Sequence, residues 1–235
     1  MKEITSDLFL LRGIPPGGFN VYLIRSGSQW VLVDTSTRYA HRRITRQLPG
    51  TLAAIFITHA HRDHAGSMHS LATQTGAPVW SSEGDANAVE GKVPEPVPQE
   101  HKDHIVNRIF GTWWKDPHPV ARRFHDGEEV AAGFTVIELP GHTPGHVGLW
   151  RESDRTVICA DTMRNLNFYT GLPQLGEMPE IFTVDVAEAR RSIRKLAALQ
   201  AKTVCFGHGR PLSANAADKI NEFAASLPPE EPTPP

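Results

Sequence analysis

Three histidines and one aspartate lie within six consecutive positions of the chain, as His59, His61, Asp63 and His64. They directly follow residues 53–57, an apolar run that is typical of a buried strand. Side chains at the end of a strand project into open space while the backbone is held in place. Imidazole nitrogens and carboxylate oxygens are ligands that zinc takes in proteins. The segment therefore predicts a metal site at the end of a strand.

The spacing divides these four residues into two pairs. His59 and His61 are two residues apart in extended chain, so their side chains point the same way and can bind one ion. Asp63 and His64 lie one step further round the turn, where a helix begins, and can bind a second ion. A polar helix start with Asp63 as its cap is the alternative interpretation. Without a metal, three histidines this close would each lose solvation, or would repel one another when protonated. This cost favours the metal site over the polar helix start.

Three more segments place a potential metal ligand directly after an apolar strand. These candidates are His142, Asp161 and His208, and His146 stands four residues after the first of them. Glycines stand beside two of these candidates, Gly141 next to His142 and Gly207 and Gly209 next to His208. A glycine lets the backbone approach a crowded centre, which gives these glycines a physical reason. Each segment alone is a weak signal, but their order after the first cluster is a specific combination.

Two series of apolar strands alternate with helices and would position these residues. In the first half, strands are expected at residues 8–11, 19–25, 30–34, 53–57 and 78–80, and helices at 38–48 and 65–74, the second ending at Gly76. In the second half, strands are expected at 134–139, 147–150, 156–160 and 203–206, and helices at 185–199, capped by Asp185, and 214–227. The runs 19–25 and 30–34 are apolar on both faces, as in strands covered on both sides. The pattern predicts an α/β fold.

The regular pattern weakens between residues 81 and 126. Three prolines and the adjacent Trp113 and Trp114 suggest an insertion or lid over a pocket, with packing of the two tryptophans on the core as the alternative. His101, His104, His118 and His125 lack compact ligand spacing and are assigned to the surface or the lid. We expect a single domain over residues 1–227 and a disordered tail, rich in proline and glutamate, over 228–235.

The composition favours a small-molecule substrate. The 235 residues carry a formal net charge of -2, which gives no bias toward nucleic acid or an anionic membrane. The N-terminal residues show no signal-peptide pattern, and no apolar run is long enough to span a bilayer. The two cysteines, Cys159 and Cys205, lie in apolar runs and are read as buried thiols, which indicates a cytoplasmic protein. The oligomeric state is left open.

In these motifs the chain resembles the metallo-β-lactamase fold superfamily of hydrolases. That superfamily carries the pattern HxHxDH, followed by a His, a bridging Asp and a final His, and the resemblance covers residues 4–226. It implies a four-layer αββα sandwich. It also implies one zinc ion on His59, His61 and His142, a second on Asp63, His64 and His208, and a bridge between them through Asp161. His142 is chosen over His146 because the family's ligand begins the HTPGH-like segment.

The resemblance implies hydrolysis by a hydroxide that bridges two zinc ions, with iron or manganese as alternative metals. Asp63 would relay a proton to the leaving group, and Asp34, at a strand end near the site, would support the ligands from outside. Candidate pocket walls are Trp113, Trp114, Arg164, Phe168 and Tyr169. Arg164 would meet a carboxylate or phosphate on the substrate, and a solvated loop residue is its alternative role.

Asp161 helps to choose between the branches of the superfamily. Members that cut β-lactams commonly have Cys or Ser at the bridging position, so the chain is more similar to the thioesterase and lactonase branches. Glyoxalase II has a C-terminal helical domain, whereas one helix and a proline tail follow His208 here. The lactonases use a Tyr shortly after the bridging Asp, and Tyr169 has a different spacing. We therefore expect a small ester, thioester or lactone as substrate, with β-lactam hydrolysis or a mononuclear iron persulfide dioxygenase as alternatives.

Overall fold

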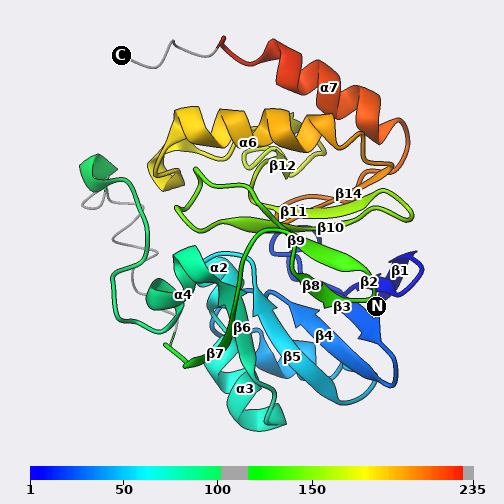
Figure 1. The fold of residues 1–235 in the computed structure, drawn as a ribbon, viewed down its shortest axis with the longest axis vertical. Coiled ribbons are helices and arrows are strands. Elements are labelled where there is room, and N and C mark those ends of the chain that lie inside the picture. Colours follow the sequence, from blue (N-terminus) through cyan, green and yellow to red (C-terminus); the bar gives the residue numbers. More distant parts are fainter. Residues whose placement is uncertain (102–115, 230–235) are drawn as a thin grey trace.

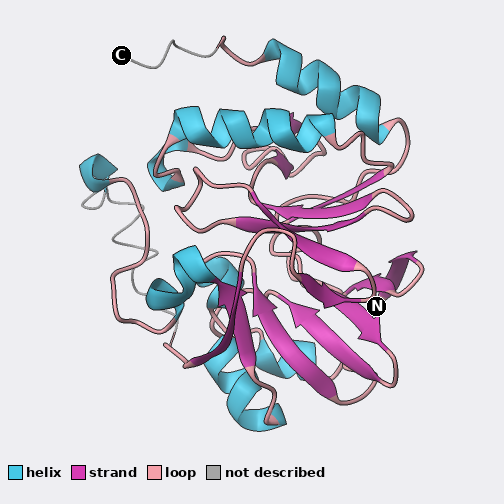
Figure 2. Cartoon of the chain, in the orientation of Figure 1, coloured by secondary structure: helices cyan, strands magenta, loops and turns pink. Residues whose placement is uncertain are grey.

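A computed structural model describes residues 1–101 and 116–229, in which two large β-sheets pack face to face between helices (Figures 1 and 2). The first sheet has seven strands in chain order: β1 (Lys2–Thr5), β2 (Leu8–Leu10), β3 (Tyr22–Ser26), β4 (Gln29–Val33), β5 (Leu52–Ile57), β6 (Val79–Ser82) and β7 (Val120–Phe124). The second sheet has the order β14 (Thr203–Phe206), β11 (Thr156–Ala160), β10 (Val147–Arg151), β9 (Phe134–Glu138) and β8 (Glu129–Ala131). A two-stranded ribbon joins β12 (Arg164–Asn165) to β13 (Leu175–Gly176).

Helices cover the outer face of each sheet. Those on the first sheet are α1 (His41–Thr45), α2 (Arg62–Ala65), α3 (Met68–Thr75) and α4 (Glu83–Val89). Those on the second sheet are α6 (Val186–Ala198) and α7 (Ala216–Ser226), which lie together at the top of Figure 1. Short 3-10 helices occupy Gln99–His101 and Glu180–Phe182.

Alternating side chains along the strands build three separate apolar cores. In β4, Leu32 packs toward the helices of the first half, whereas Val31 and Val33 pack between the two sheets. In β14, Cys205 packs between the sheets and Phe206 packs under α6 and α7. This period of two makes both faces of each strand apolar. Three cores separate four layers, which confirms the predicted α/β fold and αββα sandwich.

Parallel pairing brings the chemical segments to one edge of the molecule. Strands β4, β5 and β6 are parallel neighbours, and so are β11 and β14. Parallel neighbours end at the same edge of a sheet. Asp34, the His59 segment and Asp85 follow the first three strands, and Asp161 and His208 follow the other two.

Helices are present where they were predicted, but their bounds differ from the predicted ones. The helix expected over 38–48 is confined to α1, and the one expected over 65–74 is divided into α2 and α3. Gly76 ends α3 in the left-handed conformation, and the Asp185 carboxylate caps α6 by accepting from the Glu188 amide at 2.8 Å, both as predicted.

The segment 81–126 is more regular than expected. It contains α4, and its β7 pairs in parallel with β6 at the edge of the first sheet. The α4 helix begins at Ser82, whose hydroxyl accepts a hydrogen bond from the Asp85 amide. Both elements belong to the layered fold, so the loose pattern is confined to a shorter stretch between them. Whether that stretch acts as a lid stays a prediction, as do the single domain over 1–227 and the disordered tail.

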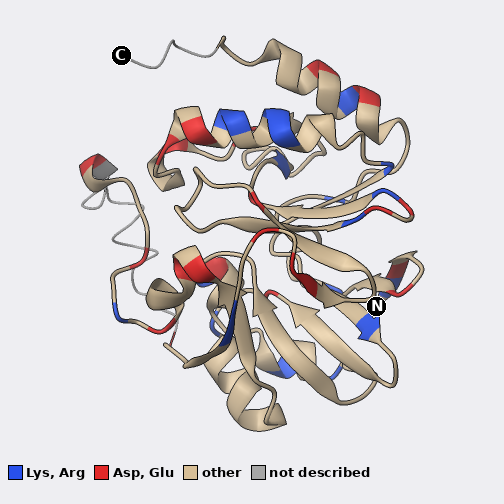
Figure 3. Ribbon diagram, in the orientation of Figure 1, with Lys and Arg blue, Asp and Glu red and all other residues tan. Residues whose placement is uncertain are grey.

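Charges are mixed over the helices that face solvent. Figure 3 shows acidic and basic residues close together along α6 and α7, while most strand segments carry neither. Cys159 and Cys205 are buried free thiols, as predicted. Within residues 1–101 and 116–229, no helix has both the length and the apolar character that a bilayer span requires.

Candidate metal centre

The structure brings seven of the predicted residues together as two adjacent groups. One contains His59, His61 and His142, and the other contains Asp63, His64, Asp161 and His208. Within each group, one potential ligand atom per residue lies within 4.8 Å of all the others. All seven are buried except Asp63, whose side chain is 26% exposed. Strand ends from both sheets supply these residues, so the centre lies where the sheets meet.

Asp161 stands between the two groups. Its Oδ2 atom lies 3.5 Å from His142 Nε2 and 3.9 Å from His59 Nε2 in the first group. In its own group, the same atom lies 3.1 Å from His208 Nε2 and 3.3 Å from His64 Nε2. One carboxylate oxygen therefore faces four imidazoles and lies between the two groups.

Each of the five histidines has one ring nitrogen held by a group outside the cluster. The outer contacts are His59 Nδ1 with Thr58 Oγ1 at 3.0 Å, His61 Nε2 with the Pro96 carbonyl at 2.7 Å, His64 Nδ1 with Asp34 Oδ2 at 2.8 Å, His142 Nδ1 with Thr183 Oγ1 at 3.3 Å, and His208 Nδ1 with the Gly18 carbonyl. The other nitrogen of each ring faces the cluster. Outer partners of this kind fix the ring and its tautomer in histidines that bind metals.

Three buried atoms at the centre suit a cation. Nε2 of His59, Nε2 of His64 and Oδ1 of Asp161 have no hydrogen-bond partner among the described residues. A buried polar atom without a partner costs free energy, and coordination of a metal removes that cost. The donor set of imidazoles and carboxylates fits zinc and other borderline divalent ions.

Two imidazoles of the first group, those of His59 and His142, favour the neutral form. Burial lowers the pKa of His59 well below its ordinary value, and the neighbouring imidazoles of His64 and His146 lower it further. Burial and the neighbouring His61 lower the pKa of His142 in the same way. A metal ligand must be neutral imidazole, so these rings are ready to bind without losing a proton.

The second group attracts positive charge. Burial opposes protonation of His208, but the carboxylates of Asp161 and Asp63 raise its pKa to about 10. Burial likewise opposes protonation of His64, and Asp161, Asp34 and Asp63 together raise its pKa well above the ordinary value. The concentration of carboxylates that holds these protons is the feature that would hold a divalent cation.

Asp34 supports one histidine in each group. Its carboxylate accepts a hydrogen bond from the Thr58 amide at 2.9 Å and contacts the Thr58 hydroxyl at 2.9 Å. Because a carboxylate only accepts, the hydroxyl donates to Asp34 and accepts from Nδ1 of His59. The same carboxylate holds His64 directly. The structure thus places Asp34 behind the ligands, as the sequence suggested.

Asp85 joins the two loops that carry the first group. Its buried carboxylate accepts from the amides of Ala60 and Gly145, each at 2.8 Å, and from the Thr143 hydroxyl at 2.7 Å. Ala60 lies between His59 and His61, and the other two donors follow His142 closely. The Asp85 side chain therefore sets the distance between these loops.

His146 holds the backbone of Asp161. Its Nε2 accepts from the Asp161 amide at 3.1 Å, and its Nδ1 lies 3.1 Å from the Leu139 carbonyl. Burial lowers the pKa of His146 to about 4, so the ring is neutral and donates to that carbonyl. Both nitrogens are occupied, which agrees with the choice of His142 as the candidate ligand.

Backbone geometry around Asp161 leaves no room for larger residues. A Cβ atom on Gly207 would lie 2.0 Å from Asp161 Oδ1, and one on Gly141 would lie 2.1 Å from the Ala189 amide nitrogen. Ala160, just before Asp161, has a φ of 45° in the left-handed region, where the pairing of β11 with β14 shifts register. Such strained non-glycine residues occur where a site fixes the backbone.

The predicted pocket residues lie in different environments. Trp113 and Trp114 lie outside the described residues. Phe168 is 45% exposed and its ring centroid lies 5.4 Å from that of His208, so it borders the centre. Tyr169 is fully exposed. The Arg164 guanidinium donates to the Glu177 carbonyl at 3.0 Å and lies over the Phe168 ring, so it holds the β12–β13 ribbon.

Several groups that hold the candidate ligands in place were not predicted from the sequence. Thr58 and Asp85 carry a usable signal, because each is a polar residue close behind an apolar strand. Thr183 lies in a loop without such a pattern. The carbonyls of Gly18 and Pro96 have no sequence signal, because every residue has a carbonyl.

Comparison with known proteins identifies the class. Residues 14–208 match the family model described as the metallo-β-lactamase superfamily, and the chain belongs to this superfamily. Together with relatives named as hydrolases, this makes the protein a hydrolase with a candidate metal site. The resemblance stated from the sequence is confirmed.

Individual relatives show how far the likeness extends. A probable metallo-hydrolase of Bacillus subtilis, YflN, is 27% identical over 230 residues, which cover 88% of this chain and 87% of that protein. A hydroxyacylglutathione hydrolase of Rhodospirillum rubrum is 27% identical over 194 residues, 80% of this chain and 61% of that enzyme.

Solved structures share the fold. TTHA1623, solved in a di-iron-bound form, has a TM-score of 0.65 and 27% identity, with 88% of this chain and 96% of that chain covered. BJP-1, a subclass B3 metallo-β-lactamase of Bradyrhizobium japonicum, has a TM-score of 0.66 and 21% identity, with 94% and 88% covered. The second likeness shows the fold alone.

Proposed function

We propose that this protein is a dinuclear zinc hydrolase that cleaves a small ester, thioester or lactone. The observation that carries the proposal is the convergence of five histidines and two aspartates, in which Asp161 faces four of the rings. Each histidine presents one nitrogen to the centre while its other nitrogen is held from outside. One zinc ion would be held by the first group and one by the second, with Asp161 shared between them.

Bound zinc would supply a nucleophilic water with a pKa near neutrality and would polarise the scissile carbonyl. The chain supplies positioning and a proton acceptor. Asp63 is the accessible carboxylate of the centre, with 26% of its side chain exposed against 2% for Asp161. Its Oδ2 lies 3.3 Å from His208 Nε2. Asp63 is therefore placed to take a proton and deliver it to the leaving group.

Acyl substrates are favoured by two independent arguments. The relative from Rhodospirillum rubrum is named a hydroxyacylglutathione hydrolase, which acts on a thioester. Asp161 occupies the shared position with a carboxylate, where β-lactam-cleaving members commonly have Cys or Ser. We include a small-molecule substrate and a cytoplasmic location in the proposal. The buried free thiols of Cys159 and Cys205 fit that location.

The metal is part of the proposal and is tested separately from the reaction. The di-iron-bound form of TTHA1623 makes iron the first alternative to zinc. Metal-free protein should be reloaded with zinc, iron or manganese and assayed with a thioester, an aryl ester, an acyl lactone and a chromogenic β-lactam. Hydrolysis of an acyl substrate by the zinc form supports the proposal.

A matched pair of variants ties activity to the centre. His142→Gln removes a candidate ligand, whereas His69→Gln removes an exposed histidine on α3. We expect loss of metal and hydrolysis in the first and wild-type values in the second. Oxygen uptake with a persulfide by an iron form, without acyl hydrolysis, would overturn the proposal in favour of a dioxygenase.

A further inference from the structure

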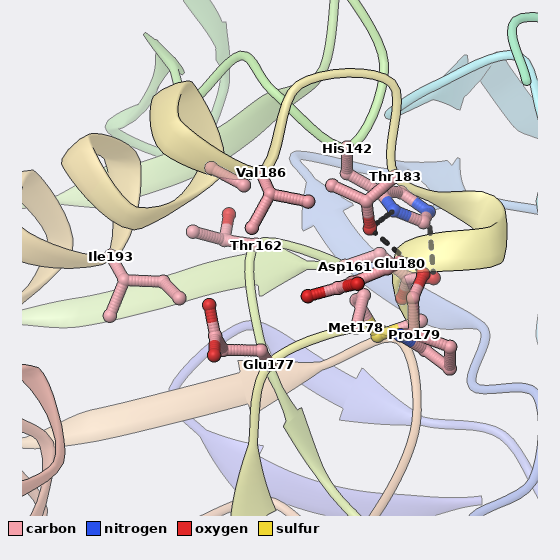
Figure 4. Close-up of a pocket in the computed structure, with 11 residues that line it drawn as sticks. His142, Asp161, Thr162, Glu177, Met178, Pro179, Glu180, Thr183, Val186 and Ile193 are labelled. Carbon is pink, nitrogen blue, oxygen red and sulfur yellow. Dashed lines mark hydrogen bonds and ion pairs between the residues drawn. The ribbon is translucent and has the colours of Figure 1, made fainter. Parts of the chain in front are cut away.

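A cavity of about 170 Å³ opens beside the metal centre, under the first half of α6 (Figure 4). We call it the α6 pocket, and its lining is His142, Asp161, Thr162, Glu177, Met178, Pro179, Glu180, Thr183, Val186, Ala189 and Ile193. His142 and Asp161 belong to the metal centre, so a group bound there would lie next to the reacting atoms. The function proposed above does not use this cavity.

The wall formed by α6 and the segment before it is aliphatic. Val186, Ala189 and Ile193 lie on one side of α6 at helical spacing, and Figure 4 shows Val186 and Ile193 on the helix side of the cavity. Met178 adds a flexible thioether. Such a surface binds apolar groups by removing them from water.

The hydroxyls of the lining are already engaged. Thr162 donates to the Cys159 carbonyl at 2.8 Å, and Thr183 donates to the Pro179 carbonyl at 3.1 Å. A hydrogen-bond acceptor on the ligand would therefore find neither hydroxyl proton free, and burying it unpaired would cost affinity. An uncharged alkyl group has no such requirement.

The charged lining residues are acidic. Glu177 forms an ion pair with Arg190 at 2.7 Å, and Glu180 is exposed at the side of the cavity. Lysine and arginine are missing from the lining, all of which lies within the described residues. A carboxylate on the bound group would be repelled by Glu180 and would have no cation in the lining to pair with.

We propose that the α6 pocket binds the acyl chain of the substrate, and that this chain is uncharged and about four to six carbons long. The inference rests on the proposed function. The length follows from the volume, because an apolar cavity of about 150 Å³ holds a benzene molecule. Each methylene placed in the pocket should raise kcat/KM about three- to fourfold, the value of burying one methylene.

The test compares p-nitrophenyl esters from acetyl to decanoyl, and adds the succinyl ester as an anionic four-carbon group. All share one leaving group, so differences report binding of the acyl chain. The zinc-loaded protein should show kcat/KM that rises from acetyl to hexanoyl by about 100-fold and then stops rising. The succinyl ester should be cleaved less efficiently than the butyryl ester.

Variants of α6 locate the effect. Val186→Leu and Val186→Phe fill the pocket progressively and should lower the ratio of hexanoyl to acetyl kcat/KM, at least tenfold for Val186→Phe. Ala187→Phe adds bulk at an exposed position of the same helix and should leave this ratio unchanged. Circular dichroism verifies that each variant is folded, and the wild-type series stands without them.

The possible outcomes distinguish failure of this inference from failure of the proposed function. Hydrolysis that is independent of chain length, or equal for succinyl and butyryl, would overturn the inference and leave the hydrolase proposal standing. Hexanoyl selectivity that survives both filling variants would place the acyl chain elsewhere. Absence of hydrolysis with every ester, thioester and lactone would overturn the proposed function itself.

Discussion

Oδ2 of Asp34 lies 2.8 Å from Nδ1 of His64, and both side chains are buried. The contact requires a proton on Nδ1, because the carboxylate can only accept. Nε2 of His64 is thereby turned toward Asp161, 3.3 Å away. Asp34 thus determines which ring nitrogen of His64 faces the centre. Through the Thr58 hydroxyl it also determines which ring nitrogen of His59 does so.

Asp34→Asn should lower zinc affinity about 10- to 100-fold, as loss of an outer partner typically does. The amide has one acceptor, so either Nδ1 of His64 or the Thr58 amide would face a donor. Asparagine tolerates the left-handed backbone at this position, where φ is 62°. Asp7→Asn, at a half-buried position with the same φ where the carboxylate pairs with Arg25, is the control. Chelator competition measures both, and equal affinities would exclude the orienting role.

Asp85→Asn should destabilise the protein by about 1–3 kcal/mol, because one of three buried donors loses its acceptor. Since the two loops of the first group then separate, zinc binding should weaken as well. In Asp126→Asn, at an exposed position, the new amide oxygen can still accept from the Glu138 amide that lies 2.8 Å from the carboxylate, so this change should have little effect. Urea unfolding and zinc titration check both; full zinc affinity in a destabilised Asp85→Asn would refute the bracing role.

Gly207→Ala should displace the bridging carboxylate, since the new methyl would lie 2.0 Å from Asp161 Oδ1. Overpacking of this kind costs about 1–3 kcal/mol, and metal content and hydrolysis should fall together. In Gly50→Ala the methyl would lie 3.4 Å from the Trp30 ring nitrogen and should be tolerated. Retention of metal by Gly207→Ala would show that the carboxylate is not confined.

Asp161→Ser should weaken the link between the two groups without unfolding the chain. Serine keeps one oxygen but lacks the charge and reach of the carboxylate. Hydrolysis should fall at least roughly 10- to 100-fold, which is the loss expected when a group that hydrogen-bonds a metal ligand is removed. Elemental analysis, steady-state kinetics and circular dichroism are the measurements. Unchanged turnover and metal content would remove Asp161 from the bridging position.

The fold could be predicted because strand periodicity and strand-end polar residues are local signals. The runs at β3, β4 and β5 were recognisable from both-face apolarity, and His59, Asp161 and His208 from their place after apolar strands. Convergence of these ends could be expected only from the resemblance, because it depends on parallel pairing between distant segments.

What could not be predicted depends on tertiary contacts. The place of Asp85 close behind a strand is visible in the sequence, but its partners are not, because β6 brings it between two loops that are distant in sequence. The carbonyls that hold His61 and His208 are chosen by backbone path alone. The α6 pocket likewise arises from a gap between α6 and the segment before it. The apolar residues of α6 recur at helical spacing in the sequence, but most of them belong to the core, so their spacing does not predict a pocket.

The central claim is that two metal ions act together, and stepwise zinc titration of the metal-free protein tests it most directly. Hydrolysis of a thioester or aryl ester should be followed as zinc is added per chain, with bound zinc measured in the same samples. The two groups of ligands predict that activity reaches its plateau at two zinc ions per chain. A plateau at one ion, or activity that appears only with a single iron, would contradict the dinuclear zinc site.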